Sequence, residues 1–316
     1  MNILITGVAG FIGYHVAKKL TGIGFDVDGI DHLQNENSNK LKKLRLNNLS
    51  SQKNFRFYNS DVKNINSLKL KNKYRCVIHL AAKAGVRQSQ AKSSEYLINN
   101  IIGHNSVLNF SLENSERMVY ASSSSVYGEH KNDFSTESDH TDNPTSIYGI
   151  SKKTCEMISE NCFLNSSFPQ IGLRFFTVYG EYGRPDMAYW IFTKNIIENK
   201  EITLFNNGEM LRDFTYIDDI VDGIIRCIEL DNFDKHSVLN LGRSEVRKTS
   251  EMVGIIENLL NKKAIIASMP KLPIDVSLTS SSNIRANNLL GYNPKISLEF
   301  GLEKFVKWYV RFKKEI

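Results

Sequence analysis

The chain has 316 residues, of which 41% are hydrophobic and 23% are charged, as in an ordinary globular enzyme. Its 40 Lys and Arg residues against 34 Asp and Glu leave a formal charge of +6, which suits a small anionic substrate. No basic stripe with interleaved aromatic residues points to nucleic acid. Because no signal peptide opens the chain and no apolar run reaches the length of a bilayer span, we expect a cytoplasmic protein.

The cysteines argue against a metal site and against a disulfide framework. The four are Cys76, Cys155, Cys162 and Cys227. They form no Cys-x-x-Cys pair and no Cys/His ligand cluster, which a structural zinc site would need. We therefore expect free thiols in a reducing compartment and no bound metal.

In the first part of the chain, short apolar runs alternate with helical patterns. The runs predict strands at 3–5, 27–30, 55–57, 76–80, 118–121 and 171–175. A helix follows the first strand to about residue 20, and a second helix is indicated at 40–46. Strands that alternate with helices form right-handed βαβ units and a parallel sheet covered on both faces. The sequence therefore predicts an α/β fold with a Rossmann-type, doubly wound sheet.

Beyond about residue 180 the pattern becomes irregular. A helix is indicated at 190–198, a turn at Gly208 and a proline-containing stretch at 270–273. We expect two domains. Residues 1–178, with a returning segment near 212–242, would bind the cofactor, and residues 179–316 would form a smaller α/β substrate domain.

The first turn carries the string Gly7-Val-Ala-Gly10-Phe-Ile-Gly13 between a strand and a helix. Glycines there permit a tight turn, close approach of a pyrophosphate and close packing of helix on strand. The free N–H groups of the helix N-terminus then face the phosphates. Glycines that serve packing alone are the alternative.

The second predicted strand ends at Asp31, eighteen residues beyond Gly13. A carboxylate at this position can accept hydrogen bonds from the adenosine ribose and repels a 2′-phosphate, which favours NAD over NADP. An Asx turn is the alternative for Asp31. Asp61 and Val62 follow the third strand and are candidates for the adenine edge.

Tyr148 and Lys152 lie four residues apart, so they share a face of a helix. The Lys ammonium would favour the Tyr phenolate, which could then take a proton from a sugar hydroxyl. Such a spacing is common by chance, and its weight comes from its place after the fifth strand. The run Ser122 to Ser125 ends that strand, and one hydroxyl could share the proton, although a serine-rich turn is the alternative.

Longer strings carry a family resemblance over residues 1 to about 310. The chain resembles the extended short-chain dehydrogenase/reductase superfamily of sugar-nucleotide epimerases and dehydratases, and most of all the UDP-glucuronate 4-epimerases. The strings are ITGVAGFIGYH, HLAAKAGVRQS, YASSSSVYGE, SIYGISKK, LRFFTVYGEYGRPDMA and RDFTYIDDIVDGI.

The resemblance implies a set of site residues. Tyr148 would be the catalytic base, with Lys152 and Ser123 as its catalytic partners. The implied cofactor-binding residues are Gly7, Gly10, Phe11, Ile12, Gly13, Asp31, Asn35, Asp61, Val62, Ala81, Ala82, Lys83, Asn100, Tyr148 and Lys152. The implied substrate-binding residues are Arg87, Ser124, Ser125, Thr177, Arg184, Arg212 and Asp275.

Among the substrate-binding residues, Arg87 and Arg184 are the candidates to grip a sugar carboxylate with a planar guanidinium fork. A surface or interdomain salt bridge is their alternative. The family's 4,6-dehydratases carry an Asp-Glu pair directly after the catalytic hydroxyl residue. Here the stretch from Ser123 to Val126 contains no acid, which favours simple oxidation and re-reduction at C4.

Three departures from the family pattern touch the substrate side. The string after Asp31 lacks paired tyrosines, Gln88 replaces a tyrosine, and Ser281 and Ser282 stand in place of Ala-Asp. The resemblance thus implies an NAD-dependent UDP-glucuronate 4-epimerase that works in polysaccharide precursor supply. It also implies a homodimer formed by helices starting near Ser93 and Tyr148. A UDP-glucose or UDP-N-acetylhexosamine 4-epimerase and a non-catalytic NAD-binding sensor are the alternatives.

Overall fold

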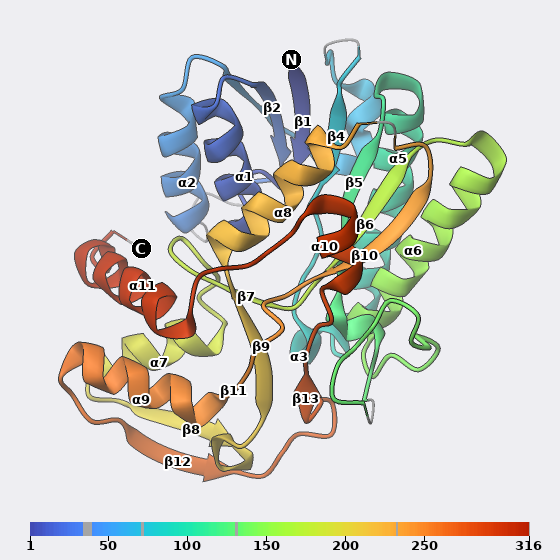
Figure 1. Ribbon diagram of the computed structural model, residues 1–316. Helices are drawn as coiled ribbons and strands as arrows, with labels where there is room; N and C mark the ends of the chain where they lie inside the picture. Colours follow the sequence, from blue (N-terminus) through green and yellow to red (C-terminus); the bar gives the residue numbers. More distant parts are fainter. Residues whose placement is uncertain (34–39, 71–72, 130–131, 232, 316) are drawn as a thin grey trace.

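A computed structural model describes residues 1–33, 40–70, 73–129, 132–231 and 233–315 (Figure 1). Its main sheet has seven parallel strands in the order β10-β6-β5-β4-β1-β2-β3. The strands are β1 (Asn2–Thr6), β2 (Asp26–Asp31), β3 (Phe55–Asn59), β4 (Cys76–His79), β5 (Met118–Ser123), β6 (Gln170–Phe175) and β10 (His236–Leu241). All six predicted strands are confirmed, as is the α/β class.

Helices cover both faces of this sheet, which is why its strands read as continuous apolar runs. On one side α1 (Phe11–Gly22) packs against α2 (Lys40–Ser50) and α8 (Ile217–Glu229). On the other side α5 (Gly103–Asn114) packs against α6 (Ile147–Ser166). Successive residues of β1 serve different faces: Ile3 and Ile5 belong to one buried cluster, and Leu4 belongs to the other.

The short elements near the strand ends complete this half of the molecule. They are η1 (Val62–Ser67), α3 (Val86–Ser89), α4 (Ser93–Leu97), the π-helical turn η2 (Ile98–Ile102) and η3 (Ser124–Val126). Because the strands are parallel, the turns that follow β1, β2, β4, β5 and β6 meet at one edge of the sheet, where ligands bind in open α/β folds.

The second half contains two smaller sheets. Strand β9 (Leu211–Tyr216) pairs with β7 (Thr177–Tyr179), β11 (Val246–Lys248) and β13 (Leu278–Thr279). Strand β8 (Glu201–Phe205) pairs in parallel with β12 (Ile265–Met269). The remaining elements are η4 (Asn206–Gly208), α7 (Ala188–Ile197), α9 (Thr249–Leu260), α10 (Ile284–Leu290) and α11 (Leu298–Phe312).

An aromatic cluster joins α7 to α11 in this half. The Tyr189 and Phe305 rings lie 4.7 Å apart edge to face, and Trp190 packs against Trp308 at 5.5 Å. Such pairs stabilise a fold beyond the area they bury. The predicted helix at 190–198 is α7, and the one at 40–46 is α2, which runs on to Ser50.

The chain returns to the main sheet after β9, because α8 packs on α1 and β10 pairs with β6. Strand β9 itself lies in the smaller sheet, although the expected returning segment began near residue 212. The division of the chain at 178 stays a prediction. Within the described residues, no helix is both long enough and apolar enough to cross a membrane.

Candidate active site

The turn after β1 brings its glycines against each other and against the end of β4. Gly7 has φ +75°, and a Cβ there would lie 2.7 Å from the Ala81 nitrogen. A Cβ on Gly13 would lie 2.2 Å from the Gly7 oxygen. Gly10 is the N-cap of α1 and offers no side-chain cap. The first N–H groups of α1, at Phe11 and Ile12, are therefore available to an anion, which fits a dinucleotide pyrophosphate.

Asp31 lies at the end of β2 with both carboxylate oxygens bonded. Its Oδ2 accepts the Ala9 N–H at 3.0 Å, and its Oδ1 accepts from Lys42 Nζ at 2.7 Å. Lys42 was not among the predicted residues. Asn35 lies outside the described residues. Asp61 caps η1 through the Lys63 N–H at 2.9 Å, and Val62 is the first residue of η1.

Asn100 connects the segment after β4 to the helix that carries Tyr148. Its Oδ1 accepts the Lys83 N–H at 2.8 Å, and its Nδ2 donates to the Lys83 oxygen at 3.0 Å. The same Nδ2 donates to Ser151 Oγ at 2.9 Å. Asn100 sits in the π-helical turn η2, a geometry that often marks functional positions. The run Ala81, Ala82 and Lys83 is thereby fixed beside the glycine turn.

The first turn of α6 packs against the serines that follow β5. Ser146 caps α6 by accepting the Gly149 N–H at 3.0 Å. A Cβ on Gly149 would lie only 2.4 Å from the Ser125 oxygen. A larger residue there would push α6 away from η3, so Gly149 is a site residue that the sequence reading missed. Its place next to Tyr148 was the available signal.

Within this contact, Lys152 is 4% exposed and its Nζ donates to the Ala121 oxygen at 2.8 Å. Ser123 Oγ accepts the Ser125 N–H and donates to Ser125 Oγ, both at 3.1 Å. The Tyr148 ring is half-buried, and in the described part of the chain its hydroxyl has no hydrogen-bond partner. Tyr148, Lys152 and Ser123 thus gather at the carboxyl end of β5, with the phenol free to meet a substrate.

A buried ion pair lies beneath this set. Arg174 on β6 donates to both carboxylate oxygens of Glu156 on α6, each at 2.8 Å. Ser122 Oγ, on β5, donates to Glu156 Oε1 at 2.6 Å. Burial alone would lower the pKa of Arg174, but the bonds and charge of Glu156 outweigh it and raise that pKa. The pair joins α6 to two strands, and the sequence reading missed it although Glu156 lies one turn after Lys152.

Arg184 lies on the Tyr148 side of the site. Its Nη2 donates to the Ala84 oxygen at 3.4 Å and pairs with Asp186 Oδ2 at 2.6 Å. Tyr96 Oη donates to the same Ala84 oxygen at 3.1 Å, and the Tyr96 ring stands edge-on to the Tyr148 ring with centroids 6.3 Å apart. The guanidinium is therefore a near neighbour of the candidate base.

Arg87 points into a different group of residues. Its Nη2 pairs with Asp275 at 2.8 Å, and its guanidinium covers the Phe205 ring at 4.4 Å. Arg212 on β9 donates to the Val276 oxygen at 2.8 Å. Burial lowers the pKa of Arg212, the charge of Asp275 opposes this, and the charge of Arg87 adds to it. Arg87, Arg212 and Asp275 therefore form one cluster.

The remaining predicted substrate residues lie in strand ends and turns. Thr177 opens β7, which pairs with β9 through the register Thr177–Phe214. Ser124 and Ser125 form η3, directly after β5.

Comparison with known proteins decides the family. The model of the NAD-dependent epimerase/dehydratase family matches residues 3–242, about three quarters of the chain. The chain belongs to this family. The expected NAD cofactor and Rossmann-type fold are confirmed at this level, and the chain is an NAD-dependent epimerase.

Relatives of this epimerase cover nearly its whole length. UDP-glucuronate 4-epimerase 2 of Arabidopsis thaliana is 37% identical over 338 residues, which cover all of this chain and 77% of that protein. A Bacillus cereus UDP-glucuronic acid 4-epimerase variant, solved with UDP-4-deoxy-4-fluoro-glucuronic acid and NAD, superposes with a TM-score of 0.92. It is 32% identical and covers 99% of this chain and 100% of its own.

A UDP-glucose 4-epimerase also matches. The Thermotoga maritima enzyme, solved with UDP-glucose, has a TM-score of 0.87 and 29% identity and covers 99% of this chain and 100% of its own. Fold similarity alone therefore does not separate the two sugars.

The serines that replace the usual Ala-Asp of the family have a structural partner in this epimerase. Ser281 Oγ donates to the buried Asp213 Oδ2 at 2.6 Å, and the Ser281 N–H donates to the same atom at 3.0 Å. The N–H groups of Arg243 and Ser244 also donate to Asp213. Burial raises the Asp213 pKa, and these hydrogen bonds oppose that rise. Ser282 donates its N–H to the Ser135 oxygen at 2.9 Å.

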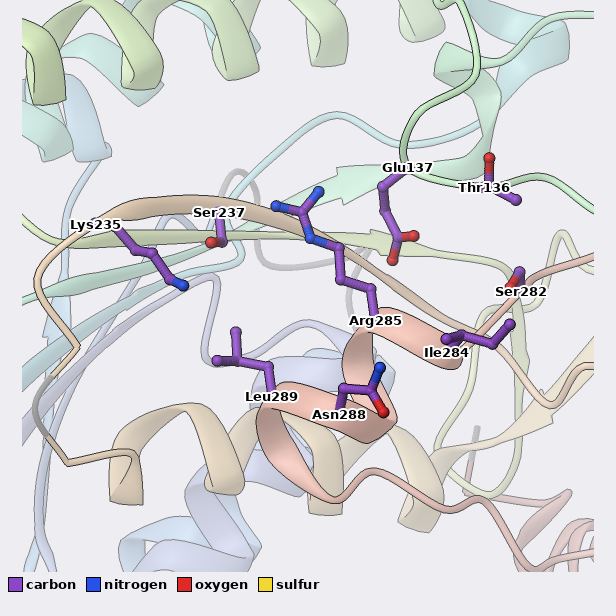
Figure 2. Close-up of a pocket in the computed structure, with 9 residues that line it drawn as sticks. All are labelled: Thr136, Glu137, Lys235, Ser237, Ser282, Ile284, Arg285, Asn288 and Leu289. Atoms are coloured by element: carbon purple, nitrogen blue, oxygen red, sulfur yellow. The ribbon is translucent and has the colours of Figure 1, made fainter.

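A hollow of about 450 Å³ lies elsewhere, at the outer edge of the main sheet (Figure 2). Lys235 and Ser237 line it from the start of β10, and Arg285 lines it from α10. Glu137, on its rim, accepts the N–H of Asn240 on β10 at 2.8 Å. The hollow contains none of the predicted site residues, so the candidate active site rests on the strand-end geometry instead.

The contact between Gly7 and Gly13 predicts that Gly13→Ala weakens NAD binding. Overpacking of about 1–3 kcal/mol corresponds to roughly 5- to 150-fold weaker binding, so the purified variant should carry far less NAD than the wild type. The cofactor released by denaturation would be quantified by chromatography. Gly22→Ala, on the same helix with nothing within 4 Å of its Cβ, is the control. A fully loaded Gly13→Ala protein would contradict the assignment.

The buried pair predicts that Glu156→Gln destabilises the fold by about 3–5 kcal/mol, because the Arg174 charge stays buried without its partner. Urea unfolding would measure the free energy of unfolding. Glu160→Gln, an exposed position on the same helix, should change it by less than about 0.5 kcal/mol. Equal stabilities of the two variants would show that the pair is not structural.

Proposed function

We propose that the protein interconverts UDP-glucuronate and UDP-galacturonate by transient oxidation at C4. The observation that carries this proposal is the position of Arg184 near the candidate base Tyr148. Arg184 and Tyr96 both donate to the Ala84 oxygen, and the Tyr96 ring contacts the Tyr148 ring. An arginine there can select a sugar whose carboxylate is attached to the carbon next to the reacting one. Two relatives named as UDP-glucuronate or UDP-glucuronic acid 4-epimerases match nearly the whole of this chain and support the same substrate.

Tyr148 is the proposed proton carrier. In its phenolate form, Tyr148 accepts the proton of the sugar 4-hydroxyl, and Ser123 Oγ, at the end of β5, hydrogen-bonds the same oxygen. NAD, held by the turn from Gly7 to Gly13, would supply the acceptor for the C4 hydride and the donor for its return. Lys152, fixed to the Ala121 oxygen at 2.8 Å, holds a positive charge one helical turn from Tyr148, which stabilises the phenolate.

Epimerisation requires the oxidised sugar to present its other face before the hydride returns. Arg212 and Thr177 hold the diphosphate end, so the sugar can turn and expose the other face of C4 while it stays anchored. Tyr148 then returns the proton to the C4 oxygen. The stretch from Ser123 to Val126 provides no carboxylic acid. No residue of this stretch can therefore eliminate water from the 4-ketone, and the sugar leaves as an isomer.

The 4-keto form of glucuronate is a β-keto acid and loses CO₂ readily. Asp186 holds the plane of the Arg184 guanidinium through Nε at 3.1 Å and Nη2 at 2.6 Å. In the described part of the chain, the Nη1 of Arg184 has no hydrogen-bond partner and can donate to the carboxylate. A carboxylate held in one orientation resists decarboxylation, because the C–C bond that would break is kept from aligning with the π system of the ketone.

A UDP-glucose or UDP-N-acetylhexosamine 4-epimerase is the second candidate. The pairing of Arg184 with Asp186 favours it, because the Asp186 charge opposes a substrate carboxylate at the same place. The Thermotoga maritima UDP-glucose 4-epimerase also has the same fold as this chain, which supports UDP-glucose as a substrate. A non-catalytic NAD sensor is a more distant candidate, which the unpartnered Tyr148 hydroxyl next to Ser123 disfavours.

We propose in addition that the protein is a homodimer. Ile98 and Ile102 of η2 and Ile150 and Met157 of α6 are 42–59% exposed, and the two elements pack together. Exposed apolar residues that gather on neighbouring helices mark association surfaces. Ile158, by contrast, packs against the core. Of the three α6 residues considered from sequence, Ile150 and Met157 are therefore the candidates for the contact.

The substrate proposal predicts that purified protein converts UDP-glucuronate to UDP-galacturonate without added NAD. Proton NMR resolves the two products and would detect any 4-keto pentose from lost CO₂. UDP-glucose and UDP-N-acetylglucosamine are run in parallel. Conversion of either of these without conversion of UDP-glucuronate would establish the second candidate and reject the first.

The proposed proton carrier predicts that Tyr148→Phe lowers kcat by roughly 10²- to 10⁴-fold, the usual contribution of a general acid–base group. Bound NAD and the affinity for UDP should stay at wild-type levels, because the ring and its packing remain. Single-turnover kinetics and the released cofactor would be measured on the same preparation. A variant with full turnover would overturn the role of Tyr148.

A further inference from the structure

Arg45, on α2, joins the glycine turn to the loop that precedes Arg184. Its side chain is almost fully buried, with 5% exposed. Nη1 donates to the Ala9 oxygen at 2.8 Å. Nε and Nη2 donate to the Tyr182 oxygen at 3.0 and 2.6 Å, and Nη2 also donates to the Gly183 oxygen at 2.9 Å. One guanidinium therefore spans two segments more than 170 residues apart in the chain.

This cation is unusual because its hydrogen-bond partners are all main-chain carbonyls. In the described part of the chain no carboxylate forms an ion pair with it. Burial lowers the pKa of Arg45 to about 10, so the group stays charged at neutral pH. A buried charge without an opposite partner is costly. Groups that cost stability in this way are expected mainly at sites where function requires them.

The loop that Arg45 holds has a strained backbone. Tyr182 adopts φ +52°, a left-handed conformation that is unfavourable for a residue with a side chain. A Cβ on Gly183 would lie 1.8 Å from Tyr189 Oη. A strained conformation persists only when its surroundings fix it. Here the Tyr182 ring packs against Tyr14 and Trp308, both at 4.8 Å, and His15 Nε2 bonds the Glu181 oxygen at 2.8 Å.

Both ends of the connection lead to groups of the site. On one side, two hydrogen bonds hold Ala9. Its N–H donates to Asp31 Oδ2 at 3.0 Å, and its oxygen accepts from Arg45. On the other side, Arg184 follows Gly183 directly, and its N–H donates to Tyr189 Oη at 3.2 Å. The conformation of residues 181–183 therefore sets where the Arg184 side chain begins, relative to the cofactor turn.

We propose that Arg45 is a positioning residue for recognition of the sugar carboxylate. It holds residues 181–183 against the glycine turn, so that Arg184 meets the carboxylate at a fixed place relative to the cofactor. This inference rests on the proposed function, because it needs a substrate carboxylate at Arg184. The hydrogen bonds of Arg45 go to main-chain oxygens of the protein, so Arg45 would act through Arg184. Its effect should therefore appear in the binding of carboxylate-bearing ligands and not in the binding of UDP.

Arginine is suited to this task and lysine is not. The three carbonyls lie on two sides of the group, and a planar fork with five donors can reach all of them. A lysine keeps the charge but has a single nitrogen. Arg45→Lys thus removes the connection while it preserves the buried charge, and Arg45→Met removes both.

The test compares the dissociation constants of UDP-glucuronate and UDP by calorimetry, on NAD-loaded protein. Arg45→Lys should weaken UDP-glucuronate binding by roughly 10- to 100-fold, the usual effect of a misplaced positioning group, and change UDP binding by less than about 2-fold. Lys43→Met, an exposed position on the same helix, is the control for α2 and should match the wild type with both ligands.

A double-variant cycle separates positioning from general stability. If Arg45 acts through Arg184, adding Arg45→Lys to Arg184→Met should weaken UDP-glucuronate binding by less than about 2-fold more, since groups that act as one unit are not additive. Additive losses would overturn the proposal. Equal losses of UDP and UDP-glucuronate affinity in Arg45→Lys would overturn it too, because they indicate a general structural role.

A second variant covers the case in which the Arg45 variants do not fold. Tyr182→Gly removes the ring that packs on Tyr14 and Trp308 but keeps the main-chain oxygens to which Arg45 donates, so selectivity for UDP-glucuronate over UDP should be retained if Arg45 positions the loop. A selective loss of UDP-glucuronate affinity in this variant would show that the ring packing positions the loop, and would reject the proposal. Failure of the proposed function looks different: wild-type protein would then bind UDP-glucuronate no more tightly than Arg184→Met does.

Discussion

The close approach of α1 to the turn after β1 is the contact on which the site depends. The Gly7 oxygen and Gly13 leave no space for a side chain, so the helix begins directly at the end of the central strand. This fixes the Ala9 peptide, which in turn bonds both Asp31 and Arg45. A displacement of a few tenths of an ångström at this turn would shift the Asp31 carboxylate and, through Arg45, the loop before Arg184, because packed interiors transmit displacements.

A second set of contacts fixes the chemistry against the cofactor turn. Helix α6 is anchored to β5 by Lys152 and by the contact of Gly149 with Ser125. Asn100 anchors it to the segment after β4. The Glu156–Arg174 pair anchors it to β6. Each anchor on α6 lies within eight residues of Tyr148, so the phenol is held from β5, from β6 and from the segment after β4, while its hydroxyl has no hydrogen-bond partner among the described residues.

The elements that sequence reasoning found are those with a strong local signal. The six strands are apolar runs bounded by turns, and the glycine string and the Tyr148–Lys152 spacing are local in sequence. Arg45 gave no such signal, and the only signal for Gly149 and Glu156 was their closeness in sequence to Tyr148 and Lys152, because the role of each residue depends on a partner in another element. An arginine in a polar, Lys-rich helix reads as solvated, yet Arg45 is buried because residues 182 and 183 return to cover it. Strand β10 was missed because its pairing with β6 is decided by the return of α8.

The edge of the main sheet shows how the fold ends its hydrogen-bonding ladder. Strand β10 is the last strand, and an open edge would offer its main-chain groups to any extended peptide. The carboxylate of Glu137 accepts the Asn240 N–H, and the Asn240 side chain donates to the Ser135 oxygen at 2.9 Å. A side chain thus takes the place that an eighth strand would occupy. An extended peptide that paired with β10 at Asn240 would first have to displace Glu137, so this carboxylate protects that part of the edge against edge-to-edge pairing.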